Sequence, residues 1–510
     1  MTQRQMAREF NVAHGAIAGW ESGARTLPGP AVRLLELHEQ ELGLAAGGPG
    51  LPRLKTSVTS RSLALSGVAG GMFARAAASA LERMLAGEGE ADGIRARARA
   101  AVARNLVRAV GELKGLAMKL GQTLAYADFA LPEIARSELA SLFTTSRPMA
   151  PSVSAQVVLE ESGEPPGALF AEWEAMPFAA ASIGQVHRAR LHSGEPVAVK
   201  VQYPAIVDAI ESDLQSLAFI DRLSAGIFRG QSRGEIVGEI RERCLEECDY
   251  RVELANMLAF QRIWDGRAGV RIPRVYPELS TRRMLVMEYV DGEDFNSFEK
   301  RASQADRNRA GTTICRLALE SILRHGIFNA DPHPGNFLFA GGDVVFLDFG
   351  CVKRFPATMI GLWRALGRSV LERRFDVTRQ VWVETGSVPD ARRYDFDYCV
   401  RMMVQLYEPW LSDEPFRFTP EFVERTWRLL AVDNPNRFRS NVPKDWVFTS
   451  RLQWGVASVL ARLGAEFDFR GLALDLLYDP GEPRPPPYTR EERAMMGVAP
   501  TPPRAGQGSV

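Results

Sequence analysis

The chain has 510 residues, of which 46% are hydrophobic and 24% are charged, and its 62 basic residues equal its 62 acidic residues in number. This length exceeds one ordinary core and predicts several domains, while the balanced charge excludes an overall attraction to nucleic acid or anionic lipid. Five cysteines without paired spacing exclude a disulfide framework and indicate a reducing, cytoplasmic setting. No secretory signal is visible, and no uncharged run approaches the ~20 apolar residues that span a bilayer.

Residues 1–44 have the pattern of a small all-α module. The stretch TQRQMAREFNVAHGAIAGWES predicts two short amphipathic helices, and LPGPAVRLLELHE predicts a third. The region resembles the helix-turn-helix of XRE/Cro-class repressors, although the first helix of that fold is missing before Met1. Its reading helix offers only His14 as a polar side chain for base edges. A vestigial or protein-docking module is therefore favoured, and DNA binding is the alternative.

A Gly/Pro-rich linker over 45–60 leads into a helical segment over 61–150. This segment is rich in Ala, Arg and Leu, and 95–124 predicts a strong amphipathic helix that ends in LKGLAMKLGQTLAYAD. Gly67 and Gly71 share one face of a small-residue patch. The patch favours close helix packing inside the protein, and contact with a membrane surface or a second copy in a dimer is the alternative.

Residues 151–290 show strand patterns from 177 onward. FAAASIGQVHRARL, a turn at HSGE, and PVAVKVQ predict an antiparallel hairpin. One long helix is expected over 232–263, followed by strands in IPRVYPEL and in RRMLVMEYV. The region therefore predicts a small β-rich domain that carries one helix.

Residues 291–478 are mainly helical in pattern, with one interruption. The stretch FNADPHPGNFLFAGGDVVFLDFG, at 328–350, predicts a hairpin in which FLF and VVFL flank a Gly-Gly turn. The Pro-rich segment 479–510 is expected to be disordered.

Two acids and an amide lie at the ends of this apolar hairpin: Asp331, Asn336 and Asp348. Burying a carboxylate costs several kcal/mol unless a cation meets it. Such a group is therefore typical of an ion pair or a metal site.

A nucleoside triphosphate needs backbone N–H groups from a tight loop, a lysine, an acid that holds the lysine, and Asp or Asn ligands for Mg²⁺. The chain offers these features in that order. Lysines are scarce, at seven of 62 basic residues, so a lysine between the valines of VAVKVQ indicates that an ammonium group itself is needed. The candidates are Ala179, Ala180, Ala181 and Ser182 in the loop, Lys200 and Glu253 as the pair, and Asp331, Asn336 and Asp348 around the hairpin.

The motifs VAVK, D-x-x-x-x-N and DFG, in this order, resemble the UbiB/AarF family of atypical kinases. The chain shows that family's own variations: AAASIGQVH in the loop, KLGQ in the helical segment, ECDY before the lysine's partner, and ADPHPGN at the catalytic loop. The resemblance covers about 61–478. It implies an α+β, protein-kinase-like bilobal fold with a small β-rich N-lobe, a helical C-lobe and a helical KxGQ-type N-terminal extension.

The resemblance implies binding of ATP and Mg²⁺. Lys200 is expected to neutralise the α- and β-phosphates while Glu253 holds it, and Asp249 is a rival partner for the lysine. The small residues of the AAAS loop would lie close to the phosphates. Backbone groups of Glu288 to Val290 would meet the adenine edge.

Three loop residues have implied roles in phosphoryl transfer. Asp348 and Asn336 are expected to bind Mg²⁺, and Asp331 to orient or deprotonate an acceptor hydroxyl or water. His333 and Cys351 are expected to pack within the loops rather than take part in chemistry.

The resemblance also implies a brake on activity. Lys119 and Gln122 are expected over the nucleotide site near Glu247 and Asp249, where they would fill the groove for a protein substrate. The implied activity is ATP hydrolysis or phosphorylation of a small, lipid-like acceptor from a prenylquinone pathway. Family members support ubiquinone and other isoprenoid-lipid pathways, often from the membrane surface, so contact with the inner face of a membrane is an option for this cytoplasmic chain.

Asn329 departs from the family pattern, which has a histidine two residues before the catalytic Asp331. That histidine usually supports Phe349, so the loop is expected to be held differently here. Weak turnover becomes an option, and the alternative function is a nucleotide-binding pseudokinase regulator with a DNA- or protein-binding helix-turn-helix.

Overall fold

The computed structural model describes residues 149–211 except 182 and 209, residues 245–441 except 438, and residues 451–498. Several predictions lie outside these residues: the helix-turn-helix over 1–44, the linker over 45–60, the extension up to 148, Lys119, Gln122 and Ser182.

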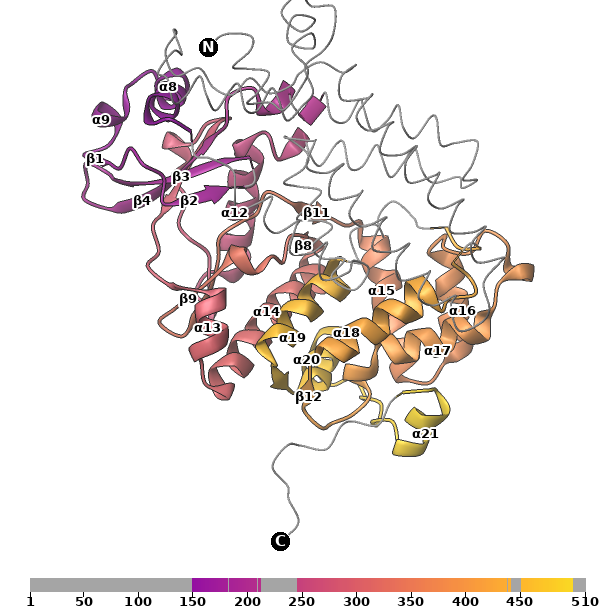
Figure 1. The fold of residues 1–510 in the computed structure, drawn as a ribbon. Coiled ribbons are helices and arrows are strands. Elements are labelled where there is room, and N and C mark those ends of the chain that lie inside the picture. The colour runs from indigo at the N-terminus through magenta and orange to yellow at the C-terminus, as the bar shows by residue number, and fades with distance from the viewer. Residues whose placement is uncertain are drawn as a thin grey trace, which may run out of the picture. The chain divides into compact units, whose positions relative to one another are not determined.

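An antiparallel sheet forms the first part of the described chain, with strand order β1-β3-β4-β6 (Figure 1). Strand β2 pairs with the first three residues of β3. Helices α8 and α9 precede it, and α12 follows β4 in the sequence. The bounds are α8 Pro151–Ser162, α9 Pro166–Leu169, β1 Glu172–Trp173, β2 Ala179–Ala181, β3 Gly184–Arg190, β4 Pro196–Gln202, α12 Tyr250–Trp264 and β6 Met284–Glu288. The hairpin predicted from AAASIGQVHRARL and PVAVKVQ is present as β3 and β4.

Alternation along β4 gives the sheet two different faces. Val197, Val199 and Val201 belong to one apolar cluster, which includes residues of α8. Ala198 belongs to the other, larger cluster, which includes residues of α12. Lys200 has the same parity as Ala198, so it lies on the α12 side of the sheet.

Two predicted elements differ in extent. The expected helix over 232–263 is broken within its described part, because a turn at Glu247–Cys248 precedes a new helix that Asp249 caps. The expected strand in IPRVYPEL is reduced to one bridge, Val275 to Met287, followed by the 3₁₀ turn η1, Pro277–Leu279. Its two prolines lack the N–H donors that a strand needs.

The predicted Gly-Gly hairpin is present in a second sheet, with strand order β5-β10-β9-β7. Gly341 and Gly342 take φ angles of 62° and 93°, which glycine adopts without steric cost. A short antiparallel pair, β8 with β11, ties the segment before the hairpin to the segment after it. The bounds are β5 Val270–Arg271, β7 Glu293–Asp294, β8 Ile327–Asn329, η2 Pro334–Asn336, β9 Phe337–Ala340, β10 Asp343–Phe346 and β11 Val352–Arg354.

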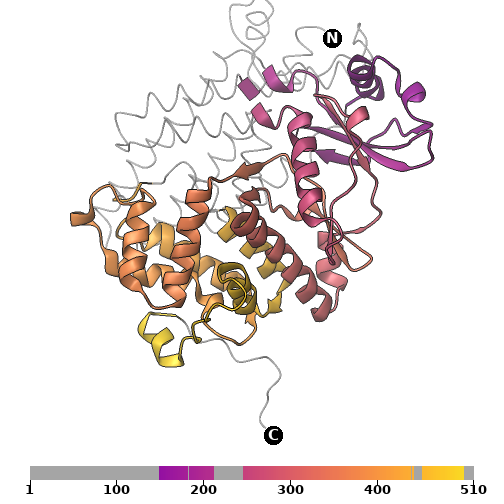
Figure 2. The ribbon, with the colours of Figure 1, turned by 180° about the vertical axis from the view of Figure 1, so that it is seen from behind.

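Helices dominate after residue 294, as predicted (Figure 2), and the 22-residue helix α14 packs against α15, α19 and α20. Ser303 caps its start, and Gly326, in the left-handed region with φ of 65°, ends it. The helices are α13 Phe295–Arg301, α14 Gln304–His325, α15 Ala357–Leu371, α16 Phe375–Glu384, α17 Phe396–Leu406, α18 Pro420–Trp427, α19 Ala457–Leu463, α20 Phe469–Leu477 and α21 Arg490–Met495. Shorter elements are η3 Ala391–Arg393, η4 Glu408–Trp410, β12 Phe416–Arg417, η5 Arg428–Val432, η7 Arg451–Val456 and β13 Glu466–Phe467. None of the described helices is both long and apolar enough to cross a membrane.

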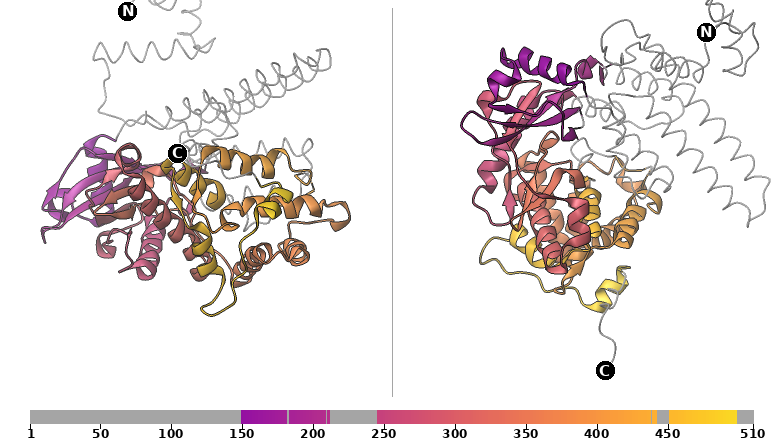
Figure 3. Two further views of the ribbon diagram at one scale, coloured as in Figure 1. Left: turned by 90° about the horizontal axis from the view of Figure 1, so that it is seen from below. Right: turned by 60° about the vertical axis from the view of Figure 1, so that its left-hand side comes forward.

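The prediction that the Pro-rich segment is disordered from 479 is wrong as far as residue 498. The segment forms helix α21, the yellow helix near the C-terminal end of the ribbon (Figure 3). Tyr488 and Val498 are buried, and α21 begins with a capping box between Thr489 and Glu492. Arg373, which follows α15, donates to the backbone oxygens of residues 486 and 487 and forms an ion pair with Glu492 at 2.7 Å. Composition missed this order because the carbonyls of the proline run are bound by arginines from elsewhere in the fold, the half-buried Arg373 and the buried Arg470.

We expect Arg373→Gln to lower the free energy of unfolding by about 1–3 kcal/mol, because it leaves carbonyls and a carboxylate of the C-terminal segment without their donor. Urea unfolding measures this change, and limited proteolysis should show faster cleavage between residues 479 and 498. Arg379→Gln is the matched control, because Arg379 pairs with Asp397 at the surface, where ion pairs contribute little. Equal effects of the two changes would contradict the docking of the segment by Arg373.

Candidate nucleotide site

Lys200 and Glu253 form a buried ion pair between β4 and α12. Lys200 Nζ lies 2.6 Å from Glu253 Oε1, and the two residues are 7% and 4% exposed. Glu253 lies in the first turn of α12 on the face that is buried. Because removing one partner leaves a buried charge uncompensated, this pair fixes the position of α12 against the sheet.

Asp249, the rival partner, has a different role. Its carboxylate accepts a hydrogen bond from the backbone N–H of Arg251 at 3.0 Å and contacts the Arg251 guanidinium at 2.5 Å. These contacts make it the N-cap of α12. The structure therefore resolves the alternative that the sequence left open, with Glu253 as the partner of Lys200.

Asp348 is the second carboxylate beside Lys200. Its Oδ2 lies 3.5 Å from Lys200 Nζ, and its Oδ1 accepts from the backbone N–H of Gly350 at 2.9 Å. Burial opposes the charge of Lys200, but Asp348 and Glu253 outweigh burial and raise the lysine's pKa. Lys200 therefore stays a cation at every physiological pH.

The catalytic-loop candidates are held by backbone bonds around Asp331, which is buried. The Asp331 carbonyl accepts from the backbone N–H of His333 at 2.8 Å and from Asn336 Nδ2 at 3.0 Å. The Asn336 carbonyl in turn accepts from the backbone N–H of Leu347 at 3.0 Å, next to Asp348. One network therefore joins the two loops that carry Asp331, Asn336 and Asp348.

Asn329 holds both loops at once. Its Nδ2 donates to the carbonyl of Asp348 at 2.7 Å, and its Oδ1 accepts from the backbone N–H of Asp331 at 3.2 Å. The prediction that the loop is held differently from the family's histidine fits this arrangement. The amide offers a donor and an acceptor together, so the substitution links the loops rather than releasing them.

Sequence reasoning missed Asn256, which fixes the DFG segment. Asn256 Nδ2 donates to the carbonyl of Phe349 at 3.0 Å, and Phe349 is fully buried against Phe260, with ring centroids 4.8 Å apart. The backbone N–H of Phe349 points to Glu253 Oε1 at 3.4 Å. The sequence pattern that could have identified Asn256 is its helical spacing from residues 253 and 260, which places all three on one face of α12.

Sequence reasoning also missed Tyr250, the first residue of α12. Tyr250 is 3% exposed, and its hydroxyl makes no hydrogen bond within the described part of the chain. The hydroxyl oxygen lies 3.0 Å from the position that a Cβ on Gly184 would occupy. The hydroxyl therefore lies against Gly184, at the start of β3, where glycine allows the close approach.

The AAAS loop lies beside β3, which carries the buried polar side chains of Gln185 and His187. Ala179–Ala181 form β2, and Ser182 is not described. Gln185 Oε1 accepts from the backbone N–H of Met149 at 2.8 Å, and Gln185 Nε2 lies 2.8 Å from His187 Nε2. Burial lowers the pKa of His187, so the ring stays neutral and donates from Nδ1 to the carbonyl of Glu174 at 2.9 Å.

The adenine candidates lie at the end of β6. The Glu288 backbone N–H donates to the carbonyl of Arg274 at 2.7 Å, and the Glu288 carboxylate binds Arg271 at 2.5 Å. Val290, two residues later, is buried. The Glu288 N–H is thus already used, and the predicted contact with adenine depends on the remaining backbone groups of this segment.

The other acidic candidate, Glu247, lies close to the DFG segment. A Cβ on Gly350 would lie 3.8 Å from Glu247 Cγ, 3.3 Å from Asp348 Oδ1 and 3.9 Å from Glu253 Oε2. Three carboxylates therefore surround Gly350. Of the residues expected to pack, Cys351 is buried and His333 accepts from the backbone N–H of Gly335 through Nδ1.

The donor set suits Mg²⁺ bound together with phosphates. Among the described residues, no cluster of three or more His, Cys, Asp and Glu side chains could hold a metal alone. Mg²⁺ needs only one or two protein ligands when phosphates and waters supply the others. Asn336 Nδ2 donates to the Asp331 carbonyl, so Asn336 Oδ1 remains available as a metal ligand. The Asp348 carboxylate is held by the backbone N–H of Gly350.

Comparisons with known proteins find kinase-like relatives of this chain. Residues 142–375 match the family model described as the ABC1 atypical kinase-like domain. The mitochondrial atypical kinase COQ8 of Saccharomyces cerevisiae is 29% identical over 368 residues, 69% of this chain and 71% of that protein. Mitochondrial COQ8B of Rattus norvegicus is 29% identical over 371 residues, 70% of this chain and 69% of that protein. AarF domain-containing protein kinase 1 of Xenopus laevis is 33% identical over 261 residues, 49% of this chain and 50% of that protein.

One solved structure has a similar fold. The chain is similar to Rv3197 of Mycobacterium tuberculosis, solved as a complex with erythromycin, with a TM-score of 0.56 and 26% identity. The match covers 77% of this chain and 100% of that one. The chain is thus similar to the ABC1 atypical kinase-like domain over residues 142–375, and to the two COQ8 kinases over about 70% of its length.

We expect Tyr250→Phe to leave the free energy of unfolding unchanged or to raise it by up to about 1 kcal/mol, because the change removes a buried hydroxyl that has no partner. Tyr394→Phe is the matched control: its hydroxyl accepts from Trp382 Nε1 at 2.8 Å, so its loss should destabilise the protein by about 1 kcal/mol. Urea unfolding of both variants measures the difference. A clear loss of stability in Tyr250→Phe would mean that the hydroxyl has a partner such as a buried water.

Proposed function

Because the chain carries an ABC1 atypical kinase-like domain, we propose that it binds Mg-ATP and acts as an atypical phosphotransferase or ATPase. The observation that carries this proposal is the buried pair of Lys200 and Glu253 beside the half-buried Asp348, with Lys200 within 3.5 Å of both acids. A structural ion pair needs one acid for one lysine, whereas a phosphate site needs a lysine, an acid that orients it and an acid for the metal. The three groups match the second requirement.

Each residue has a distinct role in this proposal. Lys200 donates hydrogen bonds to phosphate oxygens, and Glu253 keeps its ammonium group in place. Asp331 orients the acceptor hydroxyl or water and takes its proton. Asn336 and Asp348 hold Mg²⁺, which supplies positive charge that offsets the phosphates when it is bound.

The loop and the hinge would position the nucleotide. The small side chains of Ala179–Ala181 allow the backbone of β2 to lie close to phosphates, and the described members of this strand are partly exposed. The Tyr250 hydroxyl beneath the loop adds a hydrogen-bond donor at the same place. Backbone groups at Val290 would meet the adenine edge.

The acceptor is proposed to be a small, lipid-like molecule of a prenylquinone pathway rather than a protein. Two of the similar proteins are COQ8 kinases, a relationship consistent with ubiquinone biosynthesis. The proposed brake, in which Lys119 and Gln122 approach Glu247 and Asp249, would close the groove to proteins. Contact with the inner face of a membrane belongs to the same proposal.

A nucleotide-binding regulator is the alternative, in which the helix-turn-helix of residues 1–44 binds DNA or a partner protein. The observation that favours it is Asn329, which stands in place of the family's histidine. Since Asn329 bonds to both loops, it suits a fixed nucleotide-bound state as well as a catalytic one.

We expect Asp348→Asn to lower steady-state ATP hydrolysis by roughly 100-fold or more, because a carboxylate ligand of Mg²⁺ and a partner of Lys200 is lost. Hydrolysis is measured with the purified full chain in Mg-ATP, with and without a prenylated phenol. Asp376→Asn, an exposed change in the first turn of α16, is the control and should keep full activity.

The same preparations separate the two functions. Stimulated hydrolysis that Asp348→Asn removes supports the enzyme. Tight Mg-ATP binding by calorimetry without turnover under any condition supports the regulator, and absence of binding in millimolar Mg²⁺ contradicts both.

A further inference from the structure

A cluster of one arginine and two aromatic rings links β3 to the residues that flank β2 and β6. Arg188, in β3, has its guanidinium carbon 4.9 Å from the ring centre of Phe178 and 4.8 Å from that of Tyr289. The guanidinium also donates to the Tyr289 hydroxyl at 2.8 Å. The two rings meet edge to face, with centroids 5.7 Å apart. The arginine contacts both rings at once, and we call these three residues the aromatic clamp.

The two rings of the aromatic clamp come from segments that are proposed to bind different parts of the nucleotide. Phe178 directly precedes the AAAS loop, which is proposed to lie close to the phosphates. Tyr289 directly follows β6 and lies between Glu288 and Val290, the adenine candidates. The aromatic clamp is therefore a direct contact between the proposed phosphate loop and the proposed adenine segment.

The sheet register places Arg188 on the same face of the sheet as Lys200. Val186 in β3 is paired with Lys200 in β4, and Arg188 is two residues further along β3. Side chains two residues apart on a strand point to the same face. On the loop side, the Phe178 N–H donates to the Val186 carbonyl at 3.0 Å, and Ala179 pairs with Val186. The position of Phe178 therefore determines where the loop begins relative to Lys200.

The partners of the Arg188 guanidinium differ from those of a neighbouring arginine. Within the described residues, it contacts two rings and a hydroxyl rather than a carboxylate. Arg190, two residues later, pairs instead with Glu172 at 3.2 Å. A planar guanidinium stacks well on aromatic faces because it is weakly hydrated. Phe178 is 43% exposed and belongs to neither apolar cluster, so contact with Arg188 and Tyr289 holds its ring.

We propose that Arg188 is a positioning residue for nucleotide binding. Held between the two rings, it fixes the start of the AAAS loop against the segment after β6, so that the loop has its binding position before the nucleotide arrives. Such preorganisation raises affinity because less freedom is lost on binding. This inference rests on the proposed function and adds to it a residue that touches neither phosphate nor metal. Because the aromatic clamp acts on the loop, it governs affinity for Mg-ATP and leaves the catalytic step unchanged.

Calorimetry and steady-state hydrolysis of the full chain test this role. Arg188→Gln removes both ring contacts, so we expect the Kd and the KM for Mg-ATP to rise about tenfold, with kcat within about twofold of the wild-type value. Arg190→Gln is the matched control on the same strand and face, because its ion pair with Glu172 is exposed. The control should keep all three constants, and an equal rise in its Kd would overturn the proposal.

Variants of Phe178 separate positioning from support of the fold. Phe178→Tyr keeps the ring and should keep the affinity, whereas Phe178→Leu should raise the Kd about tenfold, as Arg188→Gln does. Combining Arg188→Gln with Phe178→Leu should weaken binding no further, because both changes break the same contact. Additive losses in the double variant, or a lower urea stability of Arg188→Gln with an unchanged Kd, would overturn the positioning role.

Hydrogen exchange without nucleotide distinguishes the aromatic clamp from the proposed function. The backbone N–H of Phe178 should exchange about tenfold faster in Arg188→Gln and at the wild-type rate in Arg190→Gln. If the wild type binds and hydrolyses Mg-ATP while Arg188→Gln keeps both its Kd and its exchange rate, the aromatic clamp is overturned and the enzyme stands. If exchange follows Arg188 but the wild type does not bind Mg-ATP, the proposed function fails, and with it the role in nucleotide binding, while the contact that holds the loop is supported.

Discussion

The buried ammonium group of Lys200 is the constraint on which the site depends. It lies 2.6 Å from Glu253 and 3.5 Å from Asp348, so it draws together β4, α12 and the segment that ends the hairpin. Each partner needs the others, since removing one member of a buried pair costs about 3–5 kcal/mol through the charge left behind. Lys200 therefore brings together three segments that are far apart in the sequence.

The rest of the site follows from holding α12 in this position. Asn256 and Phe260 lie one and two turns after Glu253, and they fix the carbonyl and the ring of Phe349. Asn329 then ties the segment of Asp348 to the loop of Asp331. Packing and hydrogen bonds thus extend the order from one ion pair to the residues proposed to bind metal and acceptor.

Much of this could be predicted from the sequence, because the motifs have local signatures. The valine-flanked lysine, the Gly-Gly turn and the helical periodicity each depend on neighbouring residues, and each led to the right element. The sequence favoured Glu253 as the partner of Lys200 but could not exclude Asp249, because the two acids are one helical turn apart. Only the N-cap geometry of Asp249 separates them. The hydroxyl of Tyr250 carried no signal, because nothing in a sequence reports that a buried donor lacks a partner.

Prolines led to errors in two predictions, one about order and one about a strand. Residues 479–498 looked disordered because proline-rich composition buries little apolar surface by itself. Their order comes from Arg373 and Arg470, which precede their acceptor prolines by 114 and 15 residues and donate to the carbonyls of the proline run. Likewise, the strand expected in IPRVYPEL had apolar content, but its prolines left only Val275 able to bridge β6.

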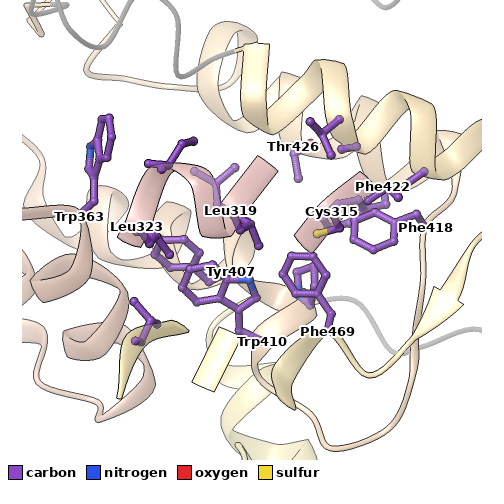
Figure 4. Close-up of a pocket in the computed structure, with 17 residues that line it drawn as sticks. Cys315, Leu319, Leu323, Trp363, Tyr407, Trp410, Phe418, Phe422, Thr426 and Phe469 are labelled. Atoms are coloured by element: carbon purple, nitrogen blue, oxygen red, sulfur yellow. The ribbon is translucent and has the colours of Figure 1, made fainter. Parts of the chain in front are cut away.

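Helix α14 lies between two hollows of the helical part. One face of the helix lines an apolar pocket together with Trp410 and Phe418 (Figure 4), and the adjacent face lines the hollow beside Asp331. Gly455, in η7, lies so close to the loop that a Cβ there would come within 2.6 Å of Pro332, so the residues before α19 also press on it. The loop that carries Asp331 is therefore supported by α14 and by η7 on one side. The ion pairs of Lys200 hold Asp348 on the other side.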